Sequence, residues 1–467
     1  MDLRPNYDAD KIRQQDLNHH FHPFTDFSTF KSTGSMILTG AEGAYVTDSE
    51  GQRYLDGIGG LWCVNIGYGR DEMADAIAAQ ARQMVYYSSF GHHTSVPAAQ
   101  LAAKLAELAP GPLNHVFYGL GGSESNDTAV RMIHFYFNRL GKPLKKKIIT
   151  RHDSYHGSTY LTMSMTGVAF DHIGFDLVAD GLIHRVSSPN TYRRPDGMTE
   201  EAFLAELVAE FRAKIEELGP ETVAAFFAEP IQGAGGVIVA PKGYHAAMAK
   251  VCREYGVLYV ADEVVTAFGR LGHFFASEDV FGMVPDIITA AKGMSSAYAP
   301  LSANIISDDI YDVLSVPQAA GAMFTHGFTY SGHPVCCAAG LKNIEIMERE
   351  DICGHVRKVG PYFEKRLRDL SALPLVGDVR GSHFMLCVEN VASKSTKALL
   401  APEHAIGKRI ANECQSRGVL VRPIAHLNVL SPPLILDVDQ VDDLVGVLGD
   451  SIQVVADQLT REGVRLD

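Results

Sequence analysis

The sequence lacks the features that would place this protein in a membrane or in a secretory pathway. None of its apolar runs approaches the roughly 20 residues that cross a bilayer. Residues 1–16 are polar and charged and contain no apolar segment of the kind that a secretory signal needs. We therefore expect neither a membrane partner nor secretion.

Cysteine is scarce and scattered along the chain. Seven cysteines are an odd number, and they have no metal-ligand spacing. This pattern predicts reduced thiols in a cytoplasmic protein. The cysteines are Cys63, Cys252, Cys336, Cys337, Cys353, Cys387 and Cys414.

Positive charge is also in short supply. The 467 residues include 41 lysines and arginines against 55 acids, a formal net charge of −14. Nucleic acids and anionic membranes reward clustered lysine and arginine, and the only basic run, residues 145–147, is short. We predict small-molecule partners. With 46% hydrophobic and 21% charged residues, the chain is typical of globular proteins and long enough for two or three domains.

Three histidines stand close together near the start, at His19, His20 and His22. We assign no metal to them, because we expect no carboxylate or cysteine at ligand spacing and Pro23 stiffens the loop. We expect an arm that packs on another surface.

The most informative stretch runs from Tyr255 to Lys292. Residues 257–261 form an apolar run that predicts a strand buried on both faces of a parallel sheet, and the run ends in Asp262. A second run, residues 287–288, leads to Lys292. An acid and an amine therefore follow the carboxyl ends of two strands, where open α/β sheets place their chemistry.

This pair suits one cofactor. A lysine among small residues can be held dehydrated, and its neutral amine can form a Schiff base with an aldehyde. An acid on the next strand can hold a cationic ring nitrogen, so the two together fit pyridoxal phosphate. By themselves Asp262 and Lys292 fit a helix-capping acid and a solvated lysine better, so the rest of the chain must decide.

A glycine-rich turn provides an anion site. The strand predicted at residues 115–118 runs into Gly119, Gly121 and Gly122, and a helix follows Ser123. Free backbone N–H groups, the helix dipole and the serine hydroxyl suit a phosphate. The dinucleotide fingerprint G-x-G-x-x-G fails, because Glu124 stands at its third glycine.

Further strands alternate with helices along the chain. Residues 148–150 lead toward Tyr155, and residues 223–228 lead to Glu229. This alternation predicts an α/β protein with a mainly parallel sheet wrapped by helices. We expect a large domain at residues 71–334 and a smaller α/β domain at residues 335–467, to which an N-terminal arm and hairpin at residues 1–70 contribute.

At this point the chain resembles a known family over nearly its whole length. The motifs are GGSESND from Gly121, SYHGS from Ser154, AEPIQGAGG from Ala228, ADEVVTAFGR from Ala261, TAAKG around Lys292 and HGFTYSGHP from His326. Their order and spacing are similar to those of the class III aminotransferases of fold type I, which depend on pyridoxal 5′-phosphate. Within that class the chain most resembles the ω-transaminases that use pyruvate.

The resemblance implies a role for each cofactor contact. Lys292 would bind the cofactor aldehyde and then move a proton, while Asp262 would pair with the ring nitrogen. Tyr155 would stack on one ring face and Val264 would press on the other. The remaining contacts would be the phosphate-binding Gly122 and Ser123, the ring-side Glu229, and Thr329 reaching the phosphate from the neighbouring subunit, which implies a homodimer or a tetramer.

The resemblance also implies a substrate pocket. Trp62, Phe24, Phe90 and Ala234 would line the amine pocket, and Arg422 would grip a substrate carboxylate with its two parallel donors. That arginine would fold away when the substrate has no carboxylate. The sequence does not name the amino donor among ω-amino acids, diamines and aryl amines.

Two positions depart from the family pattern. Gly121 replaces a serine that many members use to contact the phosphate. Ala234 replaces a glutamate that 2-oxoglutarate-using members pair with a gating arginine, whose own position here is Val429. These departures favour pyruvate as the acceptor.

Alternative functions remain at this stage. A 2-oxoglutarate-using transaminase, a decarboxylase or an aminomutase of fold type I could use the same lysine. A dehydrogenase is disfavoured by the broken glycine fingerprint. A non-catalytic cofactor-binding regulator is disfavoured because no basic nucleic-acid module is visible.

Overall fold

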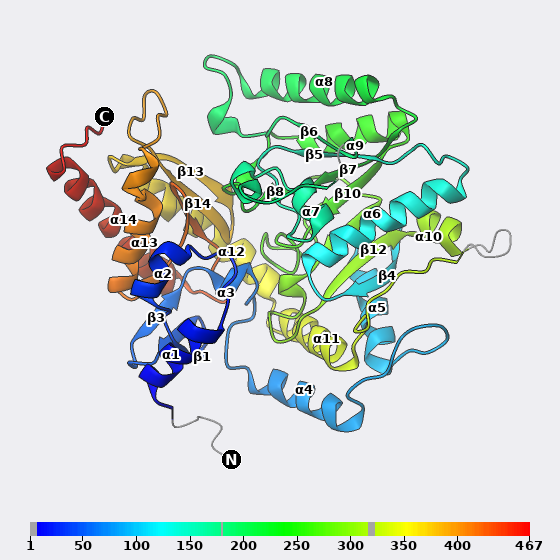
Figure 1. Cartoon of the computed structure of the whole chain (residues 1–467), viewed down its shortest axis with the longest axis horizontal. Coiled ribbons are helices and arrows are strands. Elements are labelled where there is room, and N and C mark those ends of the chain that lie inside the picture. Colours follow the sequence, from blue (N-terminus) through cyan, green and yellow to red (C-terminus); the bar gives the residue numbers. More distant parts are fainter. Residues whose placement is uncertain (1–6, 179–180, 316–322) are drawn as a thin grey trace.

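The protein has two α/β parts that lie side by side (Figure 1). The computed structural model describes residues 7–178, 181–315 and 323–467. One part is built around a seven-stranded sheet. The other contains two four-stranded sheets formed by the N-terminal and C-terminal segments of the chain.

The seven-stranded sheet is mainly parallel, as predicted. Only β12 runs against its neighbours, since it pairs antiparallel with both β11 and β4, while β10, β7, β5 and β6 pair in parallel. In spatial order the strands are β4 (Leu113–Gly119), β12 (Ser302–Ser307), β11 (Ile287–Ala290), β10 (Leu258–Asp262), β7 (Val223–Ala228), β5 (Lys147–Arg151) and β6 (Ile183–Val186).

Both faces of this sheet are buried, which explains the unbroken apolar runs of its strands. Successive side chains point to opposite faces, so Phe227 and Val260 pack with α6 residues while Phe226 and Tyr259 pack with residues of α8 and α9. The helices of this part are α4 (Asp71–Gln83), α5 (Val96–Leu108), α6 (Gly122–Arg139), α7 (Tyr160–Met165), α8 (Glu200–Leu218), α9 (Tyr244–Tyr255), α10 (Asp308–Ser315) and α11 (Pro334–Arg349).

The second part joins the two ends of the chain. Strand β15 pairs in parallel with β3, so that Val419 lies opposite Leu55. Helix α11, by contrast, packs against α4 and α5 of the large part. The strands here are β1 (Leu38–Glu42), β2 (Tyr45–Asp48), β3 (Arg53–Asp56), β13 (Val376–Ser382), β14 (Met385–Asn390), β15 (Val419–Leu420), β16 (Arg422–Ile424) and β17 (Leu427–Leu430).

The remaining elements are short or lie at the ends of the chain. Within the large sheet, β6 and β12 were not predicted, and in the smaller part α12 ends at Arg368 and continues as the 3-10 turn η4. These elements are α1 (Ala9–His19), α2 (Phe27–Thr33), α3 (Gly59–Trp62), β8 (Ile231–Gln232), β9 (Ile238–Val239), α12 (Ile352–Arg368), α13 (Ile406–Ser416), α14 (Val438–Arg461), η1 (Ala169–His172), η2 (Thr191–Arg193), η3 (Lys292–Met294), η4 (Asp369–Ala372) and η5 (Pro402–His404).

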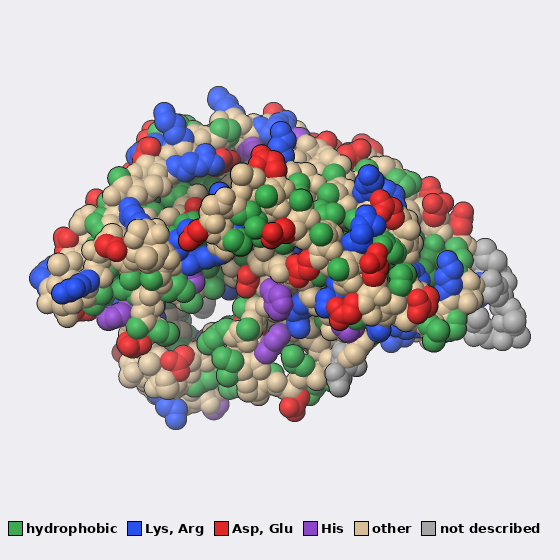
Figure 2. Space-filling view, turned by 90° about the horizontal axis from the view of Figure 1, so that it is seen from above, with side chains coloured by type: hydrophobic (Ala, Val, Ile, Leu, Met, Phe, Trp, Pro, Cys, Tyr) green, Lys and Arg blue, Asp and Glu red, His purple; other side chains and the backbone are tan. Residues whose placement is uncertain are grey.

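The surface carries charges of both signs. On the face that Figure 2 shows, lysine and arginine side chains are interspersed with acidic and hydrophobic ones. Among the described residues, no helix combines the length and the apolar character that crossing a bilayer requires.

A buried ion cluster connects η2 to β14 and leads to a pH prediction. Glu389 is 2% exposed and pairs with Arg193, with Arg380 at 2.5 Å and with His426 at 3.5 Å. Burial by itself raises the pKa of Glu389, but hydrogen bonding from His426 and the two guanidinium groups outweigh it and lower the pKa from 4.5 to about 2. A carboxylate with a lowered folded pKa stabilises the fold above its unfolded pKa, and loses this contribution as the pH falls through its folded pKa.

We expect Glu389→Gln to lower the free energy of unfolding by about 3 kcal/mol at pH 7, because a pKa shift of this size corresponds to that energy. The deficit should shrink as the pH falls from 4.5 toward about 2. Urea unfolding at several pH values measures it. The control is Glu107→Gln, which removes an exposed pair with Lys104 worth at most about 1 kcal/mol. A deficit that did not change with pH would contradict this account of the cluster.

Candidate active site

Polar turns follow five parallel strands at one edge of the large sheet. Since β4, β5, β7, β10 and β11 all run in the same direction, their carboxyl ends share that edge. The turns begin at Gly119, Arg151, Ala228, Asp262 and Ala290. Every cofactor contact predicted on the central sheet follows one of these strand ends, which is the usual place for a site in an α/β sheet.

Asp262 ends β10 and is 4% exposed. Its Oδ2 accepts a hydrogen bond from Asn126 Nδ2 at 2.8 Å and lies 2.8 Å from His156 Nδ1. Among the described residues, its Oδ1 accepts only the Val264 amide, at 3.2 Å. The first two contacts fix the carboxylate, and Oδ1 keeps capacity for another donor.

Lys292 follows the neighbouring strand β11, three residues after Thr289, which lies opposite Asp262. Burial lowers the pKa of Lys292 below its usual 10.5, while the negative charge of Asp262 acts in the opposite direction. The net effect favours the neutral amine more than in water. Its φ of 46° lies in the left-handed region, which costs a non-glycine residue of order 1 kcal/mol or more.

The glycine turn and the start of α6 form the predicted anion site. Gly121 caps the helix without a side-chain hydrogen bond, so the first amides of this 18-residue helix are free for an anion. A Cβ built on Gly121 would meet nothing within 4 Å. Ser123 Oγ accepts a hydrogen bond from the Ser158 amide at 3.0 Å. Space, free donors and a hydroxyl therefore converge at this point.

Val264 lies directly against this turn. A Cβ on Gly122 would come within 2.9 Å of Val264 Cγ1, so only glycine fits there without displacing the valine. Val264 therefore lies between the anion site and Asp262, whose Oδ1 accepts its amide.

Tyr155 and Glu229 are linked at the neighbouring strand ends. The Tyr155 amide donates to Glu229 Oε1 at 2.9 Å, and the Gly233 amide donates to Glu229 Oε2 at 2.8 Å. Burial raises the pKa of Glu229, and His156 partly opposes that increase. The Tyr155 hydroxyl lies 2.9 Å from Ser158 Oγ, on the loop that contacts Ser123.

The smaller part contributes Trp62 and Arg422, one with apolar and the other with polar neighbours. Trp62 is 4% exposed and packs beside Gly233 in an apolar cluster that includes Val429. Ala234, next to Gly233, is half-buried. Burial lowers the pKa of Arg422, with Tyr155 and then Asp171 opposing the effect. Within the described ranges, no hydrogen bond or ion pair involves the Arg422 side chain, so its donors are available.

Three predicted site residues are not brought to this edge by contacts within the single chain. Phe24 and Phe90 are 74% and 54% exposed, and Phe90 lies beside Gly327. Thr329 is exposed, and its carbonyl accepts a hydrogen bond from the Tyr86 hydroxyl at 2.5 Å. All three lie on surface segments.

Sequence reasoning missed two residues that hold Asp262. Asn126 stands within GGSESND and His156 within SYHGS, but neither was assigned a role. Asn126 also accepts a hydrogen bond from Thr289 on β11 at 2.9 Å, so it links the two central strands. A polar residue on the inner face of a predicted helix was the available signal for Asn126.

The N-terminal arm contains a carboxylate that sequence reasoning overlooked. Asp16 lies four residues before His20 and contacts it at 3.1 Å, while His22 approaches both Asp16 oxygens at 3.0 Å. The Ser35 hydroxyl donates to the same carboxylate at 2.5 Å. The expectation that no carboxylate stands near these histidines was therefore wrong. Asp16 therefore has three side-chain partners, and these contacts join the end of α1 to the loop before α2 and to the segment after it.

The residues at the sheet edge fit pyridoxal phosphate on their own chemistry. The free amides at α6 suit its phosphate, the open Oδ1 of Asp262 suits its ring nitrogen, and the dehydrated amine of Lys292 suits its aldehyde. In addition, the buried Nε2 of His156 has no hydrogen-bond partner within the described part of the chain. This polar arrangement is typical of a cofactor site.

Comparisons with known proteins agree with this chemistry. The family model described as aminotransferase class-III matches residues 29–452. Putrescine–pyruvate aminotransferase of Pseudomonas aeruginosa is 40% identical over 92% of this chain and 92% of its own length. Diaminobutyrate–2-oxoglutarate transaminase of Halomonas elongata is 38% identical over 95% of this chain and 96% of its own.

A solved structure shares the whole fold. The ω-transaminase from Pseudomonas jessenii in complex with PMP is 36% identical and has a TM-score of 0.93, and the match covers 96% of this chain and 99% of that one. The family match also covers most of the chain. This chain belongs to the class III aminotransferases, the pyridoxal-phosphate-dependent transaminases of fold type I.

Proposed function

We propose that this enzyme transfers an amino group from an ω-amino acid or another primary amine to pyruvate, giving an aldehyde or ketone and alanine. The observation that carries the proposal is the pair of Lys292 and Asp262 at the ends of adjacent parallel strands. The amine has a lowered pKa, and the carboxylate keeps one oxygen free for a further donor.

Lys292 is the proton carrier in this proposal. When bound, the cofactor supplies a cationic ring that accepts the electron pair left on the substrate carbon. Lys292 Nζ removes the proton from that carbon and returns one to the other side of the C–N bond, which requires the neutral amine that burial favours. Asp262 Oδ1 would accept a hydrogen bond from the ring nitrogen and keep it protonated.

The surrounding residues hold the ring and phosphate in place. Tyr155 would cover one ring face and Val264 the other, while Glu229 orients the Tyr155 backbone. The amides at Gly122 and the hydroxyl of Ser123 bind the phosphate. Support comes from the 2.9 Å approach that a Cβ on Gly122 would make to Val264, which brings the phosphate turn and the ring wall together.

We also propose a homodimer, with tetramers as a further possibility, in the cytoplasm. Thr329 and Phe90 are exposed in the single chain, and each would complete the site of a second copy. The seven free cysteines support a reducing compartment.

The acceptor is assigned from two small residues. Use of 2-oxoglutarate would need a second glutamate at position 234 and a gating arginine at position 429. Here these positions hold Ala234 and Val429, and Val429 is fully buried in the apolar cluster with Trp62. A guanidinium could not replace it there without an unpaired buried charge. Arg422, which lies opposite Val429 on β16, is then the residue that grips the pyruvate carboxylate.

The direct test is a half-reaction. The aminated form of the enzyme is mixed with pyruvate or with 2-oxoglutarate, and the return of the visible cofactor absorbance is followed. Pyruvate should react faster. Faster reaction with 2-oxoglutarate, the acceptor named for the Halomonas elongata relative, would refute the assignment. A panel of amines with pyruvate, measured as alanine formed, would then identify the donor.

We expect Arg422→Ala to lower kcat/KM for pyruvate by about 10²-fold, because it removes a charged partner of a partly buried carboxylate. Simple amines without a carboxylate should lose less than about threefold. Steady-state kinetics with each substrate varied in turn measures both. The control is Arg417→Ala, since Arg417 pairs with Glu413 on the surface. Equal losses for pyruvate and for amines would remove Arg422 from this role.

A further inference from the structure

The backbone that carries Lys292 is unusual and is held from one side by a single buried amide. Lys292, Ser296 and Ala297 have φ angles of 46°, 47° and 64°, so three non-glycine residues within six positions adopt the left-handed conformation. Such a turn persists only when its surroundings impose it. Two buried side chains contact this turn from opposite sides.

Asn343 in the middle of α11 provides the main contacts to this turn. Its side chain is fully buried. Its Nδ2 donates to the carbonyls of Gly293 at 2.9 Å and of Met294 at 3.1 Å, and its Oδ1 accepts from Ser296 Oγ at 2.6 Å. One side chain therefore bonds three residues of the turn, Gly293, Met294 and Ser296, beginning one residue after Lys292.

The opposite side of the turn is closed by Asn65. A Cβ built on Gly293 would lie 2.2 Å from Asn65 Nδ2, so only glycine can fit at that position. Asn65 is itself fixed, since it donates to the Phe268 carbonyl at 2.6 Å and accepts from Arg270 at 2.8 Å. The turn lies between two buried amides.

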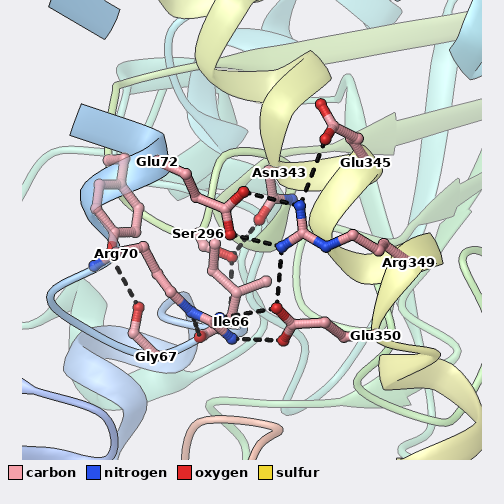
Figure 3. A network of polar contacts seen from close by, with 10 residues as sticks. Ile66, Gly67, Arg70, Glu72, Ser296, Asn343, Glu345, Arg349 and Glu350 are labelled. Carbon is pink, nitrogen blue, oxygen red and sulfur yellow. Dashed lines mark hydrogen bonds and ion pairs between the residues drawn. The ribbon is translucent and has the colours of Figure 1, made fainter. Parts of the chain in front are cut away.

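The same contacts connect the lysine turn to the segment that carries Trp62. The Ile66 amide donates to Ser296 Oγ at 3.2 Å, which makes Ser296 a bridge between Ile66 and Asn343. Figure 3 shows this bridge beside the ion pairs that join the end of α11 to the start of α4. In those pairs Arg70 contacts Glu350 at 2.7 Å and Arg349 contacts Glu72 at 2.6 Å.

We propose that Asn343 is a positioning residue for the transamination reaction: it holds the strained turn after Lys292 and thereby sets the direction and dehydration of the Lys292 amine. The proposal rests on the cofactor role of Lys292 given above. Asn343 touches no reacting atom in this account. It acts through the Gly293 and Met294 carbonyls.

The test uses the holoenzyme and two substitutions of similar shape. Asn343→Leu removes all three hydrogen bonds. Asn343→Asp keeps an acceptor for the Ser296 hydroxyl. It replaces the nitrogen that donates to the Gly293 and Met294 carbonyls with a carboxylate oxygen, which cannot donate. We expect kcat to fall about 10- to 100-fold in both, with KM for the amine changed less than about threefold, because a displaced catalytic group affects the chemical step.

A spectroscopic measurement separates positioning from general stability. The visible absorbance of the resting holoenzyme is titrated with pH. When the turn relaxes, water reaches the lysine nitrogen, and the midpoint should rise by about one unit, a tenfold change in proton affinity. Ser296→Ala, which removes one bond of the bridge, should shift the midpoint in the same direction by a smaller amount.

The control is Asn390→Leu. Asn390 is also fully buried and also donates two hydrogen bonds, to the His426 carbonyl and to Asn428, but it lies in the sheet of β14. The Asn390→Leu variant should have a lower free energy of unfolding but an unchanged midpoint in the absorbance titration. If the Asn343 variants match Asn390→Leu in midpoint and kcat, or if Ser296→Ala leaves the midpoint unchanged, the proposal is wrong. If the wild-type band instead survives in Lys292→Ala, the failure lies in the cofactor role itself.

Discussion

Lys292→Ala is expected to lose transaminase activity by at least about 10⁴-fold, the largest effect of any substitution in this chain. The loss combines two causes, since in the proposed reaction the amine both forms a covalent bond and carries the proton. The alanine also relieves the left-handed strain at position 292 only slightly, because alanine has a Cβ too. The fold should therefore remain close to that of the parent.

Two measurements check this expectation. Alanine formation from pyruvate reports activity, and borohydride reduction followed by peptide mass spectrometry reports whether the cofactor is attached to the Lys292 peptide. Lys242→Ala is the matched control, because Lys242 is exposed and lies in the turn before α9, outside the predicted site residues. A small added amine should restore part of the proton transfer in Lys292→Ala. An active variant that keeps its visible colour would refute the assignment.

Asp262→Asn is expected to produce the second largest loss, about 10²- to 10³-fold in kcat. Removing one preorganised electrostatic partner of the reacting group typically costs that much. The asparagine keeps the size of the side chain, so the contacts with Asn126 and His156 retain their geometry. What disappears is the negative charge that the proposal places opposite the ring nitrogen, together with the acceptor for the Val264 amide.

The control for this substitution lies on the same pair of strands. Asp286 precedes β11 at the other edge of the sheet, where it accepts the Tyr259 amide at 2.7 Å. Asp286→Asn should lower stability and leave kcat within about threefold of the parent. Rapid-mixing kinetics of the first half-reaction and urea unfolding of both variants separate the two effects. Equal kcat losses at the two positions would mean that charge at Asp262 has no special role.

The sequence was sufficient to predict most strands of the large sheet and the placement of Asp262 and Lys292 after two neighbouring strands. Strands such as β7 and β10 are buried on both faces, and this burial leaves a continuous apolar run that is legible without coordinates. Asp262 and Lys292 follow such runs directly. Strand β12 was not predicted, although all six of its residues are buried, because Ser302, Asn304 and Ser307 interrupt its apolar pattern.

The supporting residues could not be found in the same way. His156 contacts Asp262 from 106 positions away, and Asn343 reaches the turn after Lys292 from α11. A periodic pattern reports only which face of an element is buried. It carries no information on which polar group of a distant element meets that face.

The sequence by itself determined the fold class and the family and placed Asp262 and Lys292 after two buried strands, because buried strands, glycine turns and charged residues at fixed spacing are local properties. Only the tertiary structure decided how Asp262 is held, that Trp62 is buried with Val429, and that a strained turn carries Lys292. It also decided that no other described residue occupies the donors of Arg422. These facts depend on contacts between residues far apart in the chain, and such contacts exist only after the sheet and α11 have packed.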